Sequence, residues 1–391
     1  MDYVPHRDTY IERLTAEATG LLKGMVGIPS PSFEEDAVCS YICDWMRERG
    51  ISHNRTGNNI LCGPEHVIGS VYDEPRDGGE RRKCLMLCAH IDTVSPSEDY
   101  GFDPYSPDYK AAAKIVGELT GRELTEEDFI AGLGSNDDGG SAVAMIAAYR
   151  YFLENPDKCR TDLLLVLTCE EERSGTGGMT GLWEELEGKI DYAIIGEPTG
   201  MRAATSERGL LVIDACAEGV SGHAARNEGI NALYIALEDI EAIRRHKFSK
   251  TSARMGEVNV NVTQINAGTA HNVIPDRCTF VIDIRPTEKY ENEEILNELQ
   301  AICRSRLTPR NLRNRSSATF DGSPIQDSLE RLEIETFSSP TTSDWMRVTC
   351  DAFKMGPGDS SRSHKKNEFI LRDEIEDGIR TYISFIENFG K

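Results

Sequence analysis

Apolar side chains in the first half of the chain follow two spacings. Helical spacing recurs in four stretches, residues 8–25, 34–50, 140–154 and 177–186. Short apolar runs typical of strands cover residues 66–72, 83–92, 162–169 and 191–197. Both faces of the run 83–92 are apolar, as in a parallel sheet that helices cover on each side. The alternation predicts an α/β layered domain with a mainly parallel sheet.

A different pattern begins near residue 205. Apolar and polar residues alternate in four segments, 209–220, 256–268, 277–286 and 311–320. Two helical stretches lie between these segments, at 229–246 and 291–306. Strands grouped with two helices predict a smaller α+β domain at residues 206–319. Helical spacing then resumes, so we expect the first domain to be discontinuous, with residues 1–205 and 320–391.

Composition narrows the functional classes. The chain of 391 residues has 66 Asp and Glu against 43 Lys and Arg, a formal charge of −23. Most of its surface would repel a polyanion, so no nucleic-acid partner is expected. No signal-peptide pattern opens the chain, and no apolar run reaches the roughly 20 residues that span a bilayer, so no membrane partner is expected. The eleven cysteines lie within apolar segments rather than in a disulfide framework, which favours a reducing cytoplasm.

Metal-competent side chains stand at the ends of the predicted strands and in the turns that follow. The set comprises His90, Asp92, Asp137, Asp138, the run Glu170 to Glu172, Glu197 and, in a later loop, His364. His90 and Asp92 are two residues apart, so the carboxylate can hold the second nitrogen of the imidazole. In open α/β sheets such strand ends meet at one crevice. So many carboxylates would repel one another there, and a divalent cation among them is expected.

Each of these residues also has a purely structural interpretation. An acid in a first helical turn caps free N–H groups, and a lone His near a strand end is usually a hydrogen-bonded structural residue. Cys84 and Cys88 share the face of His90 and could indicate a Cys/His zinc site, but no second Cys pair accompanies them. Several carboxylates and two His at successive strand ends favour a metal centre instead. Mixed His and carboxylate ligation suits zinc, with cobalt or manganese as substitutes.

Longer motifs resemble a known enzyme family over almost the whole chain. They are GLGSNDDGGS at 132–141, GEPTGM at 196–201, SGHAARNEG at 221–229, INAGTAHNVIPDRCTFVIDIRP at 265–286 and GPGDSSRSH at 356–364. Together they resemble the co-catalytic zinc hydrolases that include acetylornithine deacetylase, succinyl-diaminopimelate desuccinylase, aminoacylase and glutamate carboxypeptidase. The acetylornithine or succinylornithine deacetylase branch is the most similar. The resemblance implies hydrolysis of the amide bond of an N-acyl-L-amino acid, N-acetyl- or N-succinyl-L-ornithine, in arginine biosynthesis.

The resemblance also implies two zinc ions per chain. The ligands it implies are His90 and Glu197 for one ion, Glu172 and His364 for the other, and Asp137 as the bridge between them. Asp138 is then a capping acid, and Asp92 orients His90.

Catalytic roles follow from the same resemblance. Glu171 would be the general base, although Glu170 stands where the family usually has Asp. His223, in a lid formed by the smaller domain, would contact the developing oxyanion. Asn272 and Arg285 would hold the carboxylate of the substrate. The lid would pair two chains into a homodimer, so that His223 acts across the interface.

Two departures and two alternatives accompany this interpretation. Gly139 stands where the family often has Lys, and residues 100–130, which are polar and irregular, form a longer surface excursion than the family suggests. A metallo-dipeptidase or carboxypeptidase on the same scaffold is one alternative. A non-catalytic binding protein is the other, although all five implied ligands are present.

Overall fold

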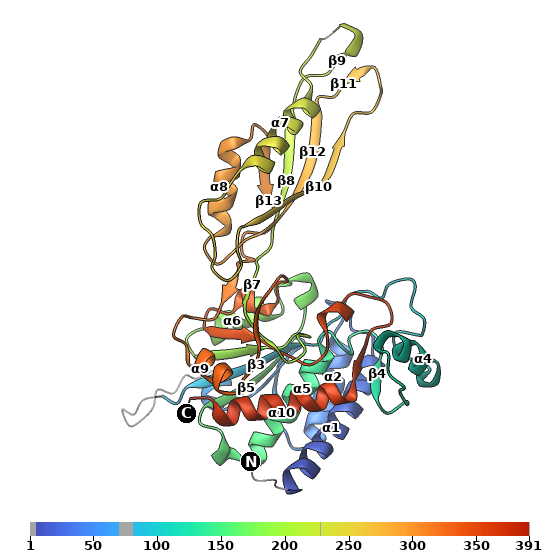
Figure 1. Cartoon of the computed structure of the whole chain (residues 1–391), viewed down its shortest axis with the longest axis vertical. Helices are drawn as coiled ribbons and strands as arrows, with labels where there is room; N and C mark the ends of the chain where they lie inside the picture. The colour runs from blue at the N-terminus through green and yellow to red at the C-terminus, as the bar shows by residue number, and fades with distance from the viewer. Residues whose placement is uncertain (1–4, 70–80, 227, 391) are drawn as a thin grey trace. The chain divides into compact units, whose positions relative to one another are not determined.

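The computed structural model describes residues 5–69, 81–226 and 228–390, and the chain divides into two compact units. The large unit contains the described residues of Met1–Thr205, Thr319–Phe337 and Ser343–Lys391. The small unit contains those of Ser206–Ala318 and Ser338–Thr342. Figure 1 shows the elements of both units along the chain.

A mixed sheet forms the centre of the large unit. Its inner strands run parallel in the order β5 (Asp162–Thr168), β3 (Cys84–His90), β6 (Tyr192–Ile195) and β16 (Asp351–Lys354). The strands beside them are antiparallel: β2 (Asn59–Cys62) and β1 (Asn54–Thr56) beyond β5, and β7 (Ala203–Glu207) next to β16. The predicted parallel sheet is therefore present, with antiparallel margins that the sequence pattern did not indicate.

Helices cover this sheet and place its strand ends. The main ones are α1 (Pro5–Val26), α2 (Asp36–Glu48), α5 (Gly139–Glu154), α6 (Met179–Leu186), α9 (Pro324–Arg331) and α10 (Arg372–Asn388). Helices α1, α5 and α10 pack together, and α5 lies against β3 and β5 (Figure 1). Every residue of β3 is buried, as expected for a strand covered on both faces. No helix among the described residues has both the length and the apolar character needed to cross a membrane.

Two predicted segments of the large unit differ from the structure. The run 66–72, predicted as a strand, begins instead as the short helix α3 (Glu65–Ile68), and its residues 70–72 lie outside the described residues. The excursion 100–130, predicted to be irregular, contains helix α4 (Tyr109–Thr120), capped by Asp108. Strand β4 (Phe129–Ala131) follows and pairs with β17 (Phe369–Leu371), and both join an apolar cluster with α4. The order of this segment thus depends on residues more than 200 positions later in the chain.

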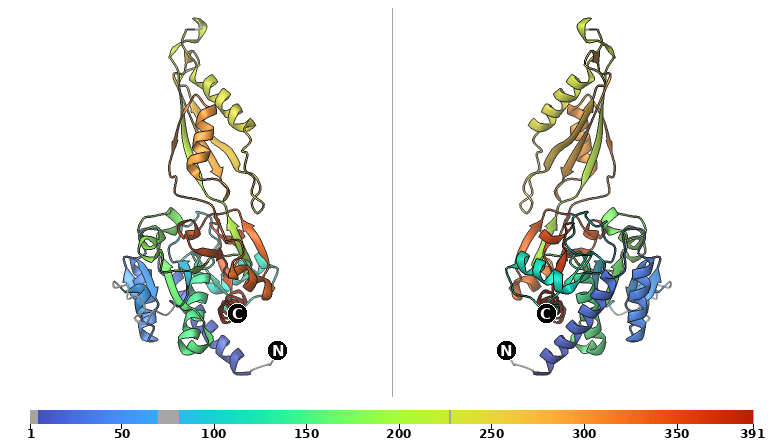
Figure 2. Two further views of the ribbon diagram at one scale, coloured as in Figure 1. Left: turned by 90° about the vertical axis from the view of Figure 1, so that its left-hand side faces the viewer. Right: turned by 90° about the vertical axis from the view of Figure 1, so that its right-hand side faces the viewer.

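The small unit is an α+β sandwich of one sheet and two helices. The sheet order is β10 (Asn259–Ala267), β12 (Arg277–Arg285), β8 (Leu211–Glu218) and β13 (Arg306–Pro309), all antiparallel. Helices α7 (Ala232–Arg245) and α8 (Asn292–Ile302) lie along one face of it (Figure 2). A two-stranded antiparallel sheet of β9 (Gly222–His223) and β11 (Val273–Ile274) completes the unit. The segment 311–320, predicted as a strand, forms only the two-residue β14 (Ser317–Ala318).

Candidate metal centre

His90 and Asp137 come together at the end of β3 and the turn before α5. The Nε2 atom of His90 lies 3.2 Å from Oδ1 of Asp137, and both side chains are buried. Burial lowers the pKa of His90, but hydrogen bonds to Asp137 and Asp92 outweigh it and hold that pKa well above its usual value. Burial raises the pKa of Asp137, but His90 more than offsets it, so the Asp137 carboxyl stays ionised. The pair is therefore a charged group inside the protein.

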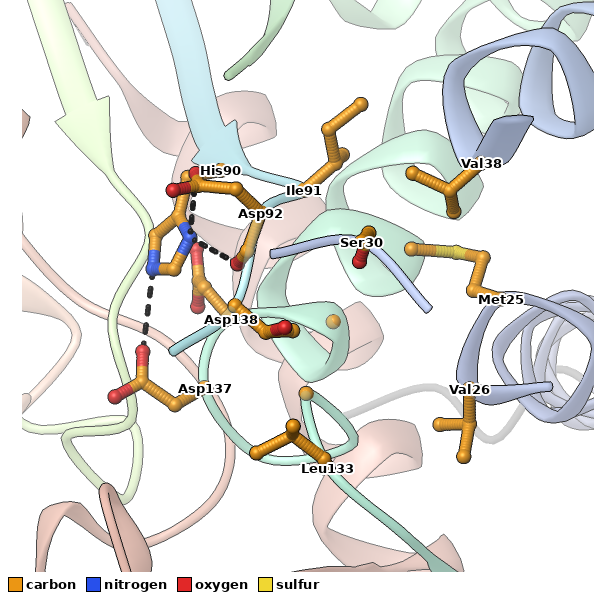
Figure 3. A pocket seen from close by; sticks show the side chains of 13 residues that line it. Met25, Val26, Ser30, Val38, His90, Ile91, Asp92, Leu133, Asp137 and Asp138 are labelled. Carbon is orange, nitrogen blue, oxygen red and sulfur yellow. Dashed lines mark hydrogen bonds and ion pairs between the residues drawn. The ribbon is translucent and has the colours of Figure 1, made fainter. Parts of the chain in front are cut away.

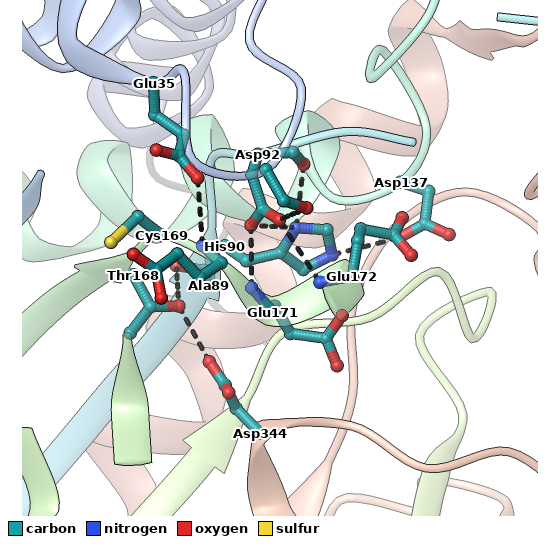
Figure 4. Close-up of polar contacts among 12 residues, drawn as sticks. Glu35, Ala89, His90, Asp92, Asp137, Thr168, Cys169, Glu171, Glu172 and Asp344 are labelled. Carbon is teal, nitrogen blue, oxygen red and sulfur yellow. Dashed lines mark hydrogen bonds and ion pairs between the residues drawn. The ribbon is translucent and has the colours of Figure 1, made fainter. Parts of the chain in front are cut away.

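Asp92 organises the residues around His90. The Nδ1 atom of His90 lies 3.0 Å from the backbone oxygen of Asp92 and 3.4 Å from its Oδ1. The carboxylate also accepts hydrogen bonds from the backbone N–H of Glu171 at 3.0 Å and of Glu172 at 3.2 Å, and from the Ser32 hydroxyl at 2.6 Å. Figure 4 shows these bonds converging on Asp92. Asp92 thus links the imidazole to the turn that carries the two glutamates.

Glu172 faces His364, which lies 192 residues later in the chain. The Nε2 atom of His364 is 2.9 Å from Oε2 of Glu172 and 3.7 Å from Oδ2 of Asp137. The hydrogen bond to Glu172 raises the pKa of His364 to about 9. Asp137 therefore stands between the two histidines, with one carboxylate oxygen toward each.

Glu171 and Glu197 add further carboxylates to the same region. Burial raises the pKa of Glu171 well above its usual value, and the charges of Glu197, Asp344 and Glu172 raise it further. Burial also raises the pKa of Glu197, and Asp137 adds to the rise. Burial and neighbouring acids thus both disfavour the ionised forms of these two carboxyls.

Glu170 does not belong to this group of carboxylates. It has a positive φ of 60°, and its Oε2 accepts the backbone N–H of Gly177 at 2.7 Å. A Cβ atom at Gly175 or Gly177 would lie 2.1 or 2.4 Å from that carboxylate, so the loop is built tightly around it. Of the acidic run, only Glu171 and Glu172 remain directed toward the centre, and Glu172 is the one beside His364.

The expectation that Asp138 caps α5 is wrong. Asp138, which follows a cis peptide bond, is the N-cap residue of α5, but its side chain makes no capping hydrogen bond. The carboxyl is buried and packs against Gly196, where a Cβ atom would lie 2.7 Å from Oδ2. Burial raises the pKa of Asp138 to about 8. The side chain points into the sheet rather than back toward the free N–H groups of the helix.

Sequence reasoning missed three buried residues around the centre. Asp344 accepts a hydrogen bond from the Thr168 hydroxyl at 2.7 Å, and Figure 4 shows it next to Glu171. Lys354 on β16 is 1% exposed, and its charge lowers the pKa of Glu197. Glu368 accepts two backbone N–H groups in the turn that carries Asp137. None of the three lies in a pattern that signals a site, because Lys354 is a single charged residue within an apolar segment and the other two each end a polar run.

These side chains fit a divalent metal. One ligand atom each from His90, Asp137 and Glu172 lies within 4.8 Å of the others. His364 contacts two of these three residues, and Glu171 and Glu197 add two more carboxylates to the same region. A small pocket beside His90 is lined by the polar Ser30, Asp92 and Asp138 and by the apolar Met25, Val26, Val38, Ile91 and Leu133 (Figure 3). Because His90 and Asp137 are buried, a cation bound to them would be screened little by solvent.

Cys84 and Cys88 do not contribute to this site. Both lie buried within β3, and burial raises the pKa of both thiols.

The three expected substrate-contacting residues lie in the small unit. His223 is exposed on β9, and its Nδ1 accepts the backbone N–H of Ala225 at 3.2 Å, which leaves Nε2 as the donor. Asn272 lies beside it, since its backbone oxygen accepts the N–H of Ala224. Arg285 lies at the far end of β12, a strand of 9 residues, and its guanidinium pairs with Asp283. A strand of this length extends about 30 Å, so one chain cannot bring Asn272 and Arg285 to the same carboxylate.

Comparison with known proteins agrees with this fold. Residues 205–311 match the peptidase dimerisation domain, and residues 71–191 match peptidase family M28. The chain is 25% identical over 383 residues to acetylornithine deacetylase from Photorhabdus laumondii, covering 90% of this chain and 91% of the relative. It is 24% identical over 328 residues to succinyl-diaminopimelate desuccinylase from Psychromonas ingrahamii, covering 76% of this chain and 81% of the relative.

Solved structures share the fold. Aminopeptidase PepT from Bacillus cereus superposes with a TM-score of 0.71 at 16% identity, covering 96% of this chain and 99% of that one. The YXEP protein of Bacillus subtilis, a dinuclear metal binding peptidase from the M20 family, gives a TM-score of 0.68 at 14% identity, covering 96% and 98%. The chain therefore has the M20 peptidase fold, with a catalytic and a dimerisation domain. These matches support a metal-dependent hydrolase that acts on amide bonds.

Proposed function

We propose that this protein hydrolyses the amide bond of an N-acyl-L-amino acid, with N-acetyl-L-ornithine as the first candidate substrate and N-succinyl-L-ornithine as the second. The observation that carries the proposal is the position of Asp137 between His90 and His364, with Glu172 beside His364. A bridging carboxylate flanked by two sets of donors suits two divalent ions, of which zinc fits mixed His and carboxylate ligation best. Glu197 would complete the set with His90.

Glu171 would act as the general base. The bound ions would supply a Lewis acid for the acyl carbonyl and a water acidic enough to attack at neutral pH. Glu171 takes the proton of that water and passes it to the leaving amine. The backbone N–H of Glu171 donates to Asp92, and burial together with neighbouring acids raises the pKa of the Glu171 carboxyl. Glu171 therefore combines a fixed position with a high proton affinity.

The small unit would complete the site from a second chain. In a homodimer, His223 and Asn272 would reach the substrate from one subunit, and Arg285 would belong to the other, which accounts for their separation along β12. His223 would donate from Nε2 to the developing oxyanion. The match to a peptidase dimerisation domain supports this assembly. Strand β10 also supports the dimer, because it is an edge strand with mostly exposed residues. Pairing two such edges would satisfy their free backbone groups.

A succinyl group would need a cation for its second carboxylate. Arg362, on the loop that carries His364, already forms two hydrogen bonds with Glu374, at 2.7 and 2.9 Å. Lys365 and Arg226 are exposed and remain candidates. A succinyl-specific enzyme would show a raised KM for the succinyl substrate in Lys365→Ala or Arg226→Ala, with the acetyl substrate unaffected.

A turnover screen tests the proposal. The enzyme, loaded with zinc or cobalt, is assayed with acetyl-ornithine, succinyl-ornithine, acetyl-citrulline, succinyl-diaminopimelate and free dipeptides. We expect ornithine substrates to give the highest kcat/KM. Rapid turnover of dipeptides with no turnover of acyl-ornithines would instead establish the peptidase alternative, which the likeness to an aminopeptidase structure favours. The arginine-biosynthetic role and a cytoplasmic location are part of the same proposal, and eleven free thiols suit a reducing compartment.

A further inference from the structure

The loop that carries His364 has an unfavourable backbone conformation. His364 has a φ of 57° and Asn367 a φ of 62°, both in the left-handed region that non-glycine residues avoid. Such residues persist where surrounding contacts determine the backbone. The loop runs from the end of β16 to the start of β17, and its contacts with the turn before α5 provide this support.

Asn136 holds the beginning of the loop. Its Oδ1 accepts the backbone N–H of Asp359 at 3.0 Å, and its Nδ2 donates to the backbone oxygen of Asp359 at 3.1 Å. The Asn136 side chain is fully buried, so it offers a fixed partner to the more exposed Asp359. Gly358 allows the close approach, because a Cβ atom there would lie 2.4 Å from Oδ1 of Asn136. The side-chain amide therefore attaches the loop immediately after Gly358.

Glu368 holds the end of the loop. Its Oε1 accepts the backbone N–H of Asn136 at 2.9 Å and that of Asp137 at 3.0 Å, and the residue is 2% exposed. Asn367 gives a third contact by accepting the backbone N–H of Gly101 at 2.5 Å. The beginning of the loop is thus attached to the side chain of Asn136, and its end to the backbone of Asn136 and Asp137. His364 lies between these attachments, facing Asp137 and Glu172.

We propose that Asn136 and Glu368 are positioning residues that place His364 against Asp137 and Glu172, and so set the affinity for the ion these three residues share. The inference rests on the proposed metal-dependent function. If the loop were not held, metal binding would have to order it, and the ordering would weaken the observed affinity. Contacts that orient a ligand from outside the coordination sphere typically change metal affinity by about 10- to 100-fold.

Asn136→Ala, Glu368→Ala and Glu368→Gln test this inference by metal binding rather than by activity. Titration of the metal-free full-length protein with zinc, in competition with a chromophoric chelator, gives the affinity of each ion. We expect both alanine variants to keep one ion at wild-type affinity and to bind the second about 10- to 100-fold more weakly. Glu368→Gln retains a side-chain oxygen that can accept the N–H groups, so it should restore most of the loss.

Asp239→Ala is a matched control from the small unit. Asp239 is also buried and accepts two consecutive backbone N–H groups, those of Arg304 and Ser305, at 2.9 and 2.7 Å. This variant should lose stability but keep both zinc affinities. Wild-type affinity for both ions in Asn136→Ala and Glu368→Ala would overturn the inference. If Glu368→Ala does not fold, Asn136→Ala and Glu368→Gln decide the question. Unchanged zinc affinities in Asn136→Ala would reject the positioning role. Weaker binding of one ion in Asn136→Ala, with wild-type binding in Glu368→Gln, would support it. Failure of the wild-type protein to bind two ions would instead refute the proposed function.

Discussion

Glu171 and Glu172 are neighbours in the chain, yet their side chains have different surroundings. Glu172 lies 2.9 Å from His364, whereas Glu171 lies among Glu197, Asp344 and His90 as a carboxyl of raised pKa. Glu171→Gln keeps the shape but cannot accept a proton. It should retain both metals and lose more than the roughly 10²–10⁴-fold in kcat typical of acid–base catalysis, because Glu171 also generates the nucleophile.

Glu172→Gln is the comparison for that variant. It should lose one metal, since Glu172 is placed as a ligand. Metal content by elemental analysis, measured with kcat for both variants, separates the two roles. Metal loss in Glu171→Gln together with retention in Glu172→Gln would reverse the assignment.

Asp344 makes the stability of the large unit depend on pH. Burial raises the pKa of Asp344 from 3.8 to about 6, with a contribution from Asp92. Because the folded-state pKa is the higher one, its contribution to stability is complete below about pH 4 and is lost as the pH rises through about 6. Asp344→Asn removes this titration. Between about pH 4 and 7, the free energy of unfolding of the variant should therefore gain up to about 3 kcal/mol relative to wild type.

Urea unfolding of both proteins without metal, at each pH, measures this difference. The Asn side chain keeps an oxygen for the Thr168 hydroxyl, so the comparison isolates the ionisation. Parallel pH profiles for variant and wild type would show that Asp344 does not titrate in this range.

At the scale of elements, the start of α5 depends on a glycine. A Cβ atom at Gly139 would lie 2.3 Å from the backbone oxygen of Gly134 and 2.5 Å from Leu22. The chain therefore cannot place a larger side chain here without moving the turn that carries Asp137. Gly139→Ala should destabilise the protein by about 1–3 kcal/mol, the usual cost of overpacking.

Gly20→Ala, a substitution within α1, is the control for Gly139→Ala. No atom lies within 4 Å of the Cβ position at Gly20, so the substitution should stabilise the helix by up to about 1 kcal/mol. Thermal unfolding of the two variants gives opposite shifts if the close approach at Gly139 matters. Equal stability of the two would contradict the packing argument.

At the scale of the whole molecule, the proposed dimer makes a prediction about mixed subunits. His223→Ala and Glu171→Gln chains should each be inactive alone. If His223 acts across the interface, each mixed dimer contains one site with an intact Glu171 from one chain and an intact His223 from the other. Mixing the variants under conditions that exchange subunits should therefore restore activity.

Glu171→Gln mixed with Glu172→Gln is the negative control, because both substitutions affect the same strand-end turn and no mixed dimer regains an intact site. Differently tagged chains report the exchange itself. A mixture of His223→Ala and Glu171→Gln that exchanges but stays inactive would exclude the arrangement across the interface.

The sequence by itself determined the elements whose apolar residues have helical spacing or form a short continuous run. Helices α1 and α5 and strands β3, β5 and β6 were predicted within a few residues, because the spacing and the length of apolar runs record which segments are buried. The ends of these strands also carried His90, Glu172 and Glu197, and the order of parallel strands made their meeting predictable. Motif resemblance added the roles of these residues, which periodicity alone could not supply.

Tertiary structure decided which residues face one another. Periodicity identifies a buried face but not the partner that covers it, so the order of 100–131 against β17 was missed. The same reason applies to Glu368, which binds the Asn136 backbone from 232 residues away, and to Asp138, whose carboxyl turns into the sheet instead of capping α5. Such contacts depend on how the elements pack, and only the folded chain specifies that arrangement.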